Sequence, residues 1–251
     1  PFEGLDLSSI RYMTNAAAPL PPAQVLKLLE LFPRSRLFSM YGQTECTRAA
    51  FLDPAKAATK PGSSGRAIPN CELWVADADG RPVQPGTTGE LIVRGSNVMR
   101  GYWGRPDLTA AKLRDGPILG EKVLHTGDLF RADADGDLWF IARTYDVFKC
   151  RGEKVSPREI ENVIYEMPEV AEAAVVGVDD PVDGTAIKLV IVARSELTER
   201  DVRRFCRDRL DIAFMPKFVE FVAELPKTES GKLKRRDWVS APGRGESAQA
   251  G

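Results

Sequence analysis

The 251-residue sequence predicts a mixed α/β and α+β fold, in which the end of a large domain is followed by a small, mobile α+β domain. Two observations predict this class. Within residues 60–140, glycines and prolines separate short segments of alternating apolar and polar residues, a pattern typical of strands joined by turns. After Arg143 the pattern becomes mixed, and amphipathic helical stretches stand between apolar runs of strand length. We therefore expect one domain over residues 1–144 and a second over residues 145–240.

The first domain is expected to begin with a helix and a strand. Residues 19–32 predict a helix, because two prolines suit its first turn and apolar residues recur at helical spacing. These apolar residues are Val25, Leu28, Leu29 and Phe32. A short apolar strand over residues 37–40 then leads into a turn at Tyr41 and Gly42.

The β-rich region at 60–140 predicts a barrel-like or sandwich-like subdomain of the first domain. Its alternating segments lie at 72–77, 89–94 and 138–143. The pairs Asp79-Gly80 and Asp135-Gly136 are typical hairpin turns.

The second domain is expected to alternate strands and helices over about ninety residues, a suitable size for a small domain. Strands are predicted at 147–150, 170–178, 187–193 and 218–222. Ser156 to Glu159 reads as a capping box that opens a helix to about residue 167, and Thr198 caps a second helix to about residue 210. Residues 241–251 are rich in glycine, serine, alanine and charge, which predicts a disordered tail.

Composition excludes several classes of function. The sequence has 35 Lys plus Arg against 36 Asp plus Glu, so no strong net charge favours nucleic acid. No apolar run approaches the roughly 20 residues that span a bilayer. Four widely spaced cysteines predict reduced thiols and a cytoplasmic location. The single histidine, His125, excludes a two-histidine metal site and argues against a histidine-based triad, so we expect a packed or surface side chain.

The segment Tyr41-Gly42-Gln43-Thr44-Glu45 follows an apolar strand, and strand ends are where α/β sheets bind ligands. A tyrosine ring can stack on a purine, a threonine hydroxyl can contact a phosphate, and a carboxylate is a suitable ligand for Mg²⁺. By itself, however, the segment is more simply an ordinary polar turn.

The segment Thr126-Gly127-Asp128 can also be interpreted in two ways. A carboxylate can accept two hydroxyl groups and so clamp a ribose diol, because charge-assisted hydrogen bonds are strong. Alone, Asp128 is more simply a turn residue.

The sequence contains three further segments of interest. They are Gly89-Glu90-Leu91, the block from Arg143 to Gly152, and the stretch from Leu225 to Leu233, which contains Lys232. From about Asn15 to Lys232 the sequence thereby resembles the adenylate-forming superfamily. That superfamily includes acyl-CoA synthetases, adenylation domains of peptide synthetases and beetle luciferases. Because the chain opens at Pro1 without methionine, we expect it to be the C-terminal portion of such an enzyme.

The resemblance implies roles for individual residues. ATP and CoA would be bound by Tyr41, Gly42, Thr44, Asp128, Arg143 and Gly152. Mg²⁺ would be held by Glu45. The catalytic residues would be Lys232, Thr44, Glu45 and Lys149. The segment around Glu90 would be architectural.

The resemblance also implies domain alternation. Lys232, on the mobile domain, would serve the first half-reaction, and rotation would then bring Lys149 and Gly152 to the site. The family's hinge position is commonly Asp or Lys, but here it is Tyr145, followed by Asp146, so either residue is a candidate hinge. A second departure is Ala142, where the family typically has glycine.

The function implied is ATP-dependent activation of a small-molecule carboxylic acid through an acyl-adenylate, followed by thioester formation with CoA, as in fatty acid metabolism. The family's upstream phosphate loop has no counterpart here, so the chain alone is expected to be inactive. One alternative is an acyl-AMP ligase or adenylation enzyme that loads the phosphopantetheine of an acyl carrier protein. Others are a non-catalytic nucleotide-binding relative and a luciferase-like oxygenase.

Overall fold

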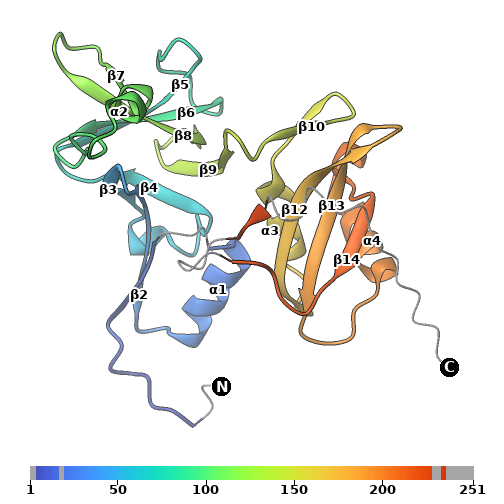
Figure 1. Cartoon of the computed structure of the whole chain (residues 1–251). Coiled ribbons are helices and arrows are strands. Elements are labelled where there is room, and N and C mark those ends of the chain that lie inside the picture. Colours follow the sequence, from blue (N-terminus) through green and yellow to red (C-terminus); the bar gives the residue numbers. More distant parts are fainter. Residues whose placement is uncertain (1–3, 17–19, 228–232, 236–251) are drawn as a thin grey trace. The chain divides into compact units, whose positions relative to one another are not determined.

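The computed structural model describes residues 4–16, 20–227 and 233–235 (Figure 1). Its contacts divide the chain into two compact units, Pro1–Tyr145 (unit 1) and Asp146–Gly251 (unit 2). The division falls between the two residues that the sequence offers as a hinge. The expected tail at 241–251 and Lys232 both lie outside the described residues.

Unit 1 is dominated by one sheet, and among the described residues nine of its strands join in it. Its elements are β1 (Tyr12–Asn15), α1 (Pro22–Leu31), β2 (Arg36–Gln43), β3 (Cys46–Phe51), η1 (Pro54–Lys56), β4 (Ser63–Ala67), β5 (Cys71–Ala76), β6 (Thr88–Gly95), α2 (Pro106–Lys112), β7 (Leu113–Asp115), β8 (Lys122–Ala132) and β9 (Leu138–Arg143). The strand order is β1-β2-β3-β4-β9-β8-β6-β5, with β7 paired to β8. β1 and β2 run parallel, and the remaining pairs of this sheet are antiparallel.

The expected β-rich region is present, but its strand order is an open path and not the closed ring of a barrel. A second difference concerns the first motif. β2 continues through Tyr41 to Gln43 because Tyr41 pairs with Ala50 and Gln43 with Cys46 on β3. The turn that the sequence places at Tyr41 and Gly42 therefore lies at Thr44 and Glu45.

The core of unit 1 meets the candidate site at Tyr41, whose ring packs against two of its apolar clusters. One of these clusters contains Phe130, which is fully buried. Tyr41 and Phe130 make an edge contact with ring centroids 4.8 Å apart and an interplanar angle of 75°. Such T-shaped pairs are a favoured aromatic geometry, so the core holds the orientation of Tyr41.

Unit 2 has a hairpin, a sheet and two α-helices in its described residues. Its elements are β10 (Phe148–Cys150), β11 (Glu153–Val155), α3 (Pro157–Ile164), β12 (Val170–Asp180), β13 (Gly184–Ala193), α4 (Glu199–Arg207), η2 (Ile212–Phe214) and β14 (Phe218–Phe221). β12 pairs antiparallel with β13, and β13 pairs parallel with β14.

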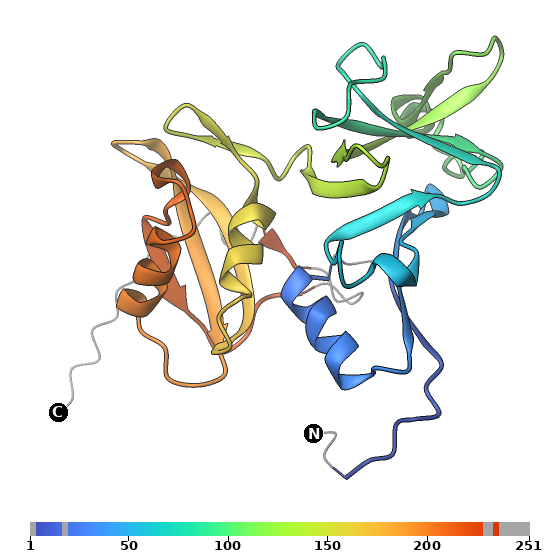
Figure 2. The ribbon, with the colours of Figure 1, turned by 180° about the vertical axis from the view of Figure 1, so that it is seen from behind.

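The sheet of unit 2 buries both faces. Figure 2 shows α3 and α4 in front of it, and their buried residues share one cluster with Val175 and Leu189 of the strands. The alternate positions Ala174 and Val190 face the other way and pack with Leu225. This alternation is expected for strands, whose successive side chains point to opposite faces.

The two predicted helix caps differ. Thr198 forms the full capping box with Asp201 at the start of α4. Ser156 occupies the N-cap position of α3, but its side chain makes no capping hydrogen bond, so the capping box predicted from Ser156 and Glu159 is wrong. Pro157 does occupy the first turn of α3, as expected.

Candidate functional site

The structure brings together three polar side chains of unit 1 around one carboxylate. The Tyr41 hydroxyl and Nε2 of Gln43 both donate to Oδ2 of Asp128, at 2.8 and 2.7 Å. Nε of Arg143, the register partner of Asp128 on β9, lies 3.6 Å from the other oxygen, Oδ1. Tyr41 and Gln43 come from β2, whereas Asp128 comes from β8, so the site depends on long-range packing.

Burial shapes the electrostatics of this cluster. Asp128 is only 3% exposed. Its burial raises the pKa of the carboxyl group, although Tyr41 and Arg143 favour the charged form. Burial also raises the pKa of Tyr41, and the adjacent charge of Asp128 raises it further. Tyr41 is therefore a protonated donor at physiological pH, and a pair of hydrogen bonds holds the carboxylate.

A distortion of β8 aims Asp128 at its partners. Thr126, Gly127 and Asp128 stand between the pairs His125–Ile92 and Leu129–Glu90, where β6 has one residue. Gly127 has a φ of 75°, in the left-handed region that favours glycine. The Thr126 hydroxyl donates to the Leu91 carbonyl at 2.7 Å and accepts from the amide of Asp128 at 3.1 Å. Bulges of this kind commonly re-aim a side chain beside a functional site.

Two further groups hold the same bulge. Lys112 of α2 donates through Nζ to the Thr126 carbonyl at 2.8 Å. Thr144 donates to the Gly127 carbonyl through both its amide and its hydroxyl, each at 2.9 Å. Three bonding partners therefore hold the backbone around Asp128: Lys112, Thr144 and the carbonyl of Leu91.

Glu45 lies in the turn between β2 and β3, next to the exposed Thr44. The Tyr102 hydroxyl donates to Oε1 of Glu45. Tyr102 is itself held by its amide, which donates to Oγ1 of Thr109 at 2.9 Å. Burial raises the pKa of Tyr102 to about 12, with the bond to Glu45 adding to the effect.

Gly42 marks a change of register between β2 and β3. A side chain at this position would come within 2.6 Å of the amide nitrogen of Arg48, so the close approach of the two backbones requires glycine here.

The residues fit a nucleotide and a cation chemically. The half-buried Glu45 offers carboxylate oxygens, which are hard ligands suited to Mg²⁺. Oδ1 of Asp128 faces Arg143, whose side chain is 37% exposed, so a ligand could approach this oxygen from the arginine side.

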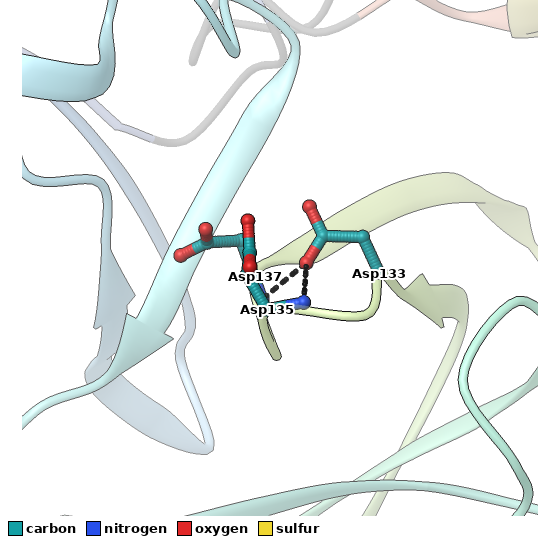
Figure 3. Close-up of side chains that lie close together, drawn as sticks. All are labelled: Asp133, Asp135 and Asp137. Carbon is teal, nitrogen blue, oxygen red and sulfur yellow. Dashed lines mark hydrogen bonds between the residues drawn. The ribbon is translucent and has the colours of Figure 1, made fainter.

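A second acidic cluster lies at the β8–β9 turn, where Asp133, Asp135 and Asp137 converge (Figure 3). Oδ1 of Asp133 accepts the amides of Asp135 and Asp137. Lys60 already lies among the carboxylates, with Nζ 2.7 Å from an oxygen of each. Lys56 adds a pair with Asp137 at 2.8 Å. With Arg66, whose Nε lies 3.1 Å from Oδ1 of Asp137, three cations balance the three carboxylates, and we assign no metal to the cluster.

The predicted residues of unit 2 lie on its hairpin. Lys149 is exposed on β10, opposite Lys154 of β11. Gly152 occupies the turn between these strands with a φ of 88°. Lys232 lies outside the described residues, and the nearest described positions are Lys227 and Leu233, which form an isolated bridge.

Several contacts of the site were missed by sequence reasoning. Gln43 stands inside a quoted motif but received no role, although it is a direct partner of Asp128. The sequence predicts an architectural segment around Glu90 and a packed or surface position for His125, but not the contact between the two side chains. Neither Lys112 nor Tyr102 is predicted to contact the site, because only the fold brings them to Thr126 and Glu45.

A cavity of about 500 Å³ lies elsewhere in unit 1 and contains none of the predicted site residues. Its lining includes Arg11, Arg34 and Phe38. The four cysteines are free, buried thiols. No helix in the described part of the chain is long and apolar enough to cross a membrane.

Comparison with known families identifies the chain. Residues 2–103 match the family model for the AMP-binding enzyme, and residues 159–232 match the model for the AMP-binding enzyme C-terminal domain. The chain belongs to the AMP-binding enzyme family. The two matches have the same order along this AMP-binding chain as the two units of the structure.

Individual relatives of the AMP-binding chain are CoA ligases. It is 38% identical over 240 residues to an indoleacetate–CoA ligase of Aromatoleum aromaticum, covering 94% of this chain and 45% of the relative. It is 37% identical over 237 residues to a long-chain-fatty-acid–CoA ligase of Escherichia coli O157:H7, covering 94% and 41%. The chain thus spans less than half the length of these relatives.

A solved structure supports the fold. The AMP-binding chain superposes on an amide bond synthetase from Marinactinospora thermotolerans with a TM-score of 0.84 and 33% sequence identity. The superposition covers 93% of this chain and 47% of that enzyme.

Proposed function

We propose that the chain is part of an ATP-dependent acid–thiol ligase. A carboxylic acid and ATP would form an acyl-adenylate and pyrophosphate, and the thiol of CoA would then capture the acyl group. The observation that carries the proposal is the carboxylate of Asp128, held by Tyr41 and Gln43 beside Arg143, in a chain of the AMP-binding family.

The residues of unit 1 would bind the nucleotide. Asp128 would accept the ribose hydroxyls through charge-assisted hydrogen bonds, and Arg143 would contact ribose and phosphate. Tyr41 would lie against the adenine, at the end of a strand whose close approach to β3 is allowed by Gly42. Thr44, exposed in the β2–β3 turn, would donate its hydroxyl to phosphate.

Glu45 would hold Mg²⁺. A bound Mg²⁺ would neutralise charge on the phosphate oxygens. In the structure, Oε1 of Glu45 accepts the hydroxyl of Tyr102, so Mg²⁺ would compete with that hydroxyl for this oxygen.

Unit 2 would supply the alternating residues. Lys232 would place positive charge where negative charge develops between α-phosphate and carboxylate in the first half-reaction, an effect that commonly dominates such catalysis. Lys149 and Gly152 would serve thiol capture, and Gly152 leaves open space where a side chain would stand. The boundary between Tyr145 and Asp146 would be the hinge between the two states.

Both relatives are CoA ligases, which favours CoA as the acceptor over a carrier protein. One relative acts on indoleacetate and the other on long-chain fatty acids, and these names support an apolar acid as the substrate class. We propose an apolar carboxylic acid of this kind. The amide bond synthetase adds a second candidate acceptor, an amine, because it shares the fold at 33% identity.

The test uses the full-length protein that contains this chain. In the Lys232→Ala variant, pyrophosphate exchange is expected to fall by about 100-fold, which corresponds to about 2.7 kcal/mol of transition-state stabilisation. Capture of a supplied acyl-adenylate by CoA should be retained. Lys234→Ala, two positions along, is the matched control and should leave both half-reactions unchanged.

Equal loss of both half-reactions in Lys232→Ala would contradict the alternating role. Supplying CoA, a phosphopantetheinylated carrier protein or a simple amine to the unmodified protein separates the acceptors. If the acyl group is transferred only to the amine, the acceptor in the proposed reaction is an amine and not a thiol.

A further inference from the structure

The bulge that presents Asp128 leaves the backbone amide of Gly127 to be satisfied by a side chain. Three residues of β8, from Thr126 to Asp128, oppose one residue of β6, so the amide of Gly127 cannot pair with the neighbouring strand. A side chain takes its place: Oε1 of Glu90 accepts the amide of Gly127 at 2.8 Å. A half-buried amide without any acceptor would be costly, so this bond stabilises the distorted backbone.

The other oxygen of Glu90 is also held. Oε2 lies 2.9 Å from Nδ1 of His125, the residue that precedes the bulge. The side chains of Glu90 and His125 are 27% and 12% exposed, so solvent competes only weakly for the pair. Glu90 therefore contacts the bulge at its start, through His125, and at its centre, through Gly127.

We infer that Glu90, oriented by His125, is a positioning residue that holds the Thr126–Asp128 bulge and thereby aims the carboxylate of Asp128 at Tyr41 and Gln43. Asp128 directly follows the amide of Gly127, so a bond that holds this amide also sets the direction of the Asp128 side chain. Without Glu90 as its acceptor, the amide of Gly127 would be unpaired, and its φ of 75° would lose the bond that acts on that amide. Asp128 would then return toward the regular alternation of the strand.

The charge of Glu90 supports this role. Burial raises the pKa of Glu90, but the hydrogen bonds from His125 and Gly127 outweigh burial, and the net pKa lies below its ordinary value. The side chain is thus a carboxylate at neutral pH. A carboxylate forms a stronger hydrogen bond with an amide than a neutral acceptor does.

The role in ligand binding rests on the proposed function, but the positioning can be tested without a ligand. NMR spectra of the isotopically labelled 251-residue chain would follow the amide proton of Gly127 and the side-chain carboxyl carbon of Asp128. In Glu90→Ala, both signals are expected to shift. In Glu90→Gln, the amide of Gly127 should move upfield because its acceptor is neutral, whereas Asp128 should keep its original signal, since a glutamine oxygen can still accept.

The matched control is Glu72→Gln. Glu72 lies on the neighbouring strand β5 and pairs with Arg94, so its loss should move neither signal. An unchanged Asp128 signal in Glu90→Ala would overturn the inference, because the bulge would then keep its shape alone. If Glu90→Ala does not fold, Glu90→Gln decides: an unmoved Gly127 amide would show that the bond is not made.

A second measurement connects positioning to binding. In the full-length protein, calorimetry should show the Kd for AMP rising by about 10-fold in Glu90→Ala and by no more than about 3-fold in Glu90→Gln, in line with the loss and retention of one hydrogen bond. An unchanged Kd in Glu90→Ala would overturn the link to binding. If even the unmodified protein binds no AMP, the proposed function fails, while the ligand-free spectra still decide the positioning.

Discussion

The hydroxyl of Tyr41 donates to Oδ2 of Asp128 at 2.8 Å, although 87 positions separate the two residues in the sequence. The ring of Tyr41 also meets the edge of Phe130, two residues beyond Asp128 on β8. The same tyrosine is thus held by the core at its ring and by the site at its hydroxyl. The sequence motifs suggest a purine contact for Tyr41 and a ribose contact for Asp128. In the structure these two residues are hydrogen-bonded to each other.

Asp128→Ala is expected to weaken binding of AMP and ATP by the full-length protein while leaving the fold intact. Each hydrogen bond to a charged group contributes about 1.5–3 kcal/mol, and the carboxylate would make two with a ribose diol. Titration calorimetry measures the loss. Asp79→Ala, in an exposed turn of unit 1, is the control. Unchanged affinity for AMP would leave Asp128 with only a structural role, as the partner of Tyr41 and Gln43.

Glu45→Gln is expected to raise the Mg²⁺ concentration needed for half-maximal ATP binding by about 10-fold, because a neutral amide is a weaker ligand than a carboxylate. Tyr102→Phe should change this concentration in the opposite direction, since the Tyr102 hydroxyl competes for Oε1. Binding of Mn²⁺ in place of Mg²⁺, followed by electron paramagnetic resonance, provides a direct readout. Equal metal affinity in all three proteins would remove Glu45 from the metal site.

Lys60→Met is expected to move acid unfolding of unit 1 to higher pH. Burial raises the pKa of Asp133, but hydrogen bonds led by Lys60 outweigh it and lower the pKa to about 2. An aspartate in the unfolded chain titrates near pH 3.9. Because the folded pKa is the lower one, the carboxylate contributes stability above about pH 4 and loses it as the pH falls toward 2.

The measurement for Lys60→Met is circular dichroism during acid titration. Lys122→Met, which removes an exposed pair with Asp115, should leave the midpoint unchanged. A Lys60→Met chain that unfolds at the original pH would show that the carboxylates near Lys60 do not depend on it.

Arg235→Leu is expected to destabilise unit 2. Nη2 of Arg235 donates to Oε2 of Glu161 at 2.9 Å, and Nη1 donates to Oε1 and to the Val175 carbonyl. The side chain of Glu161 is only 8% exposed, so removing its partner leaves a buried charge, at a cost of about 3–5 kcal/mol.

Hydrogen exchange of the α3 amides would measure the effect of Arg235→Leu within unit 2. Arg209→Leu is the control, since its pair with Glu166 is exposed and should contribute less than about 1 kcal/mol. Equal protection of the α3 amides from hydrogen exchange in the two variants would mean that Arg235 does not stabilise the buried Glu161.

The sequence by itself determined the family, the order of the motifs and most of the local elements. Helical spacing of apolar residues located α1, and glycine-containing pairs located the β8–β9 turn. These features depend on residues close together in the chain, where propensity and periodicity act. The helix cap at Thr198 is one of these local features. Ser156 has the same kind of sequence pattern, but its side chain does not make the capping hydrogen bond.

Only the tertiary structure decided which side chains meet. The open strand order of unit 1, the extension of β2 through Gln43, and the contacts of Glu90, Lys112 and Tyr102 depend on pairing between distant segments. The bulge on β8 also depends on distant pairing, because it lies where three residues of β8 stand opposite one residue of β6. A hydrogen bond across 87 positions is set by the packing of the whole sheet, and no local pattern encodes it.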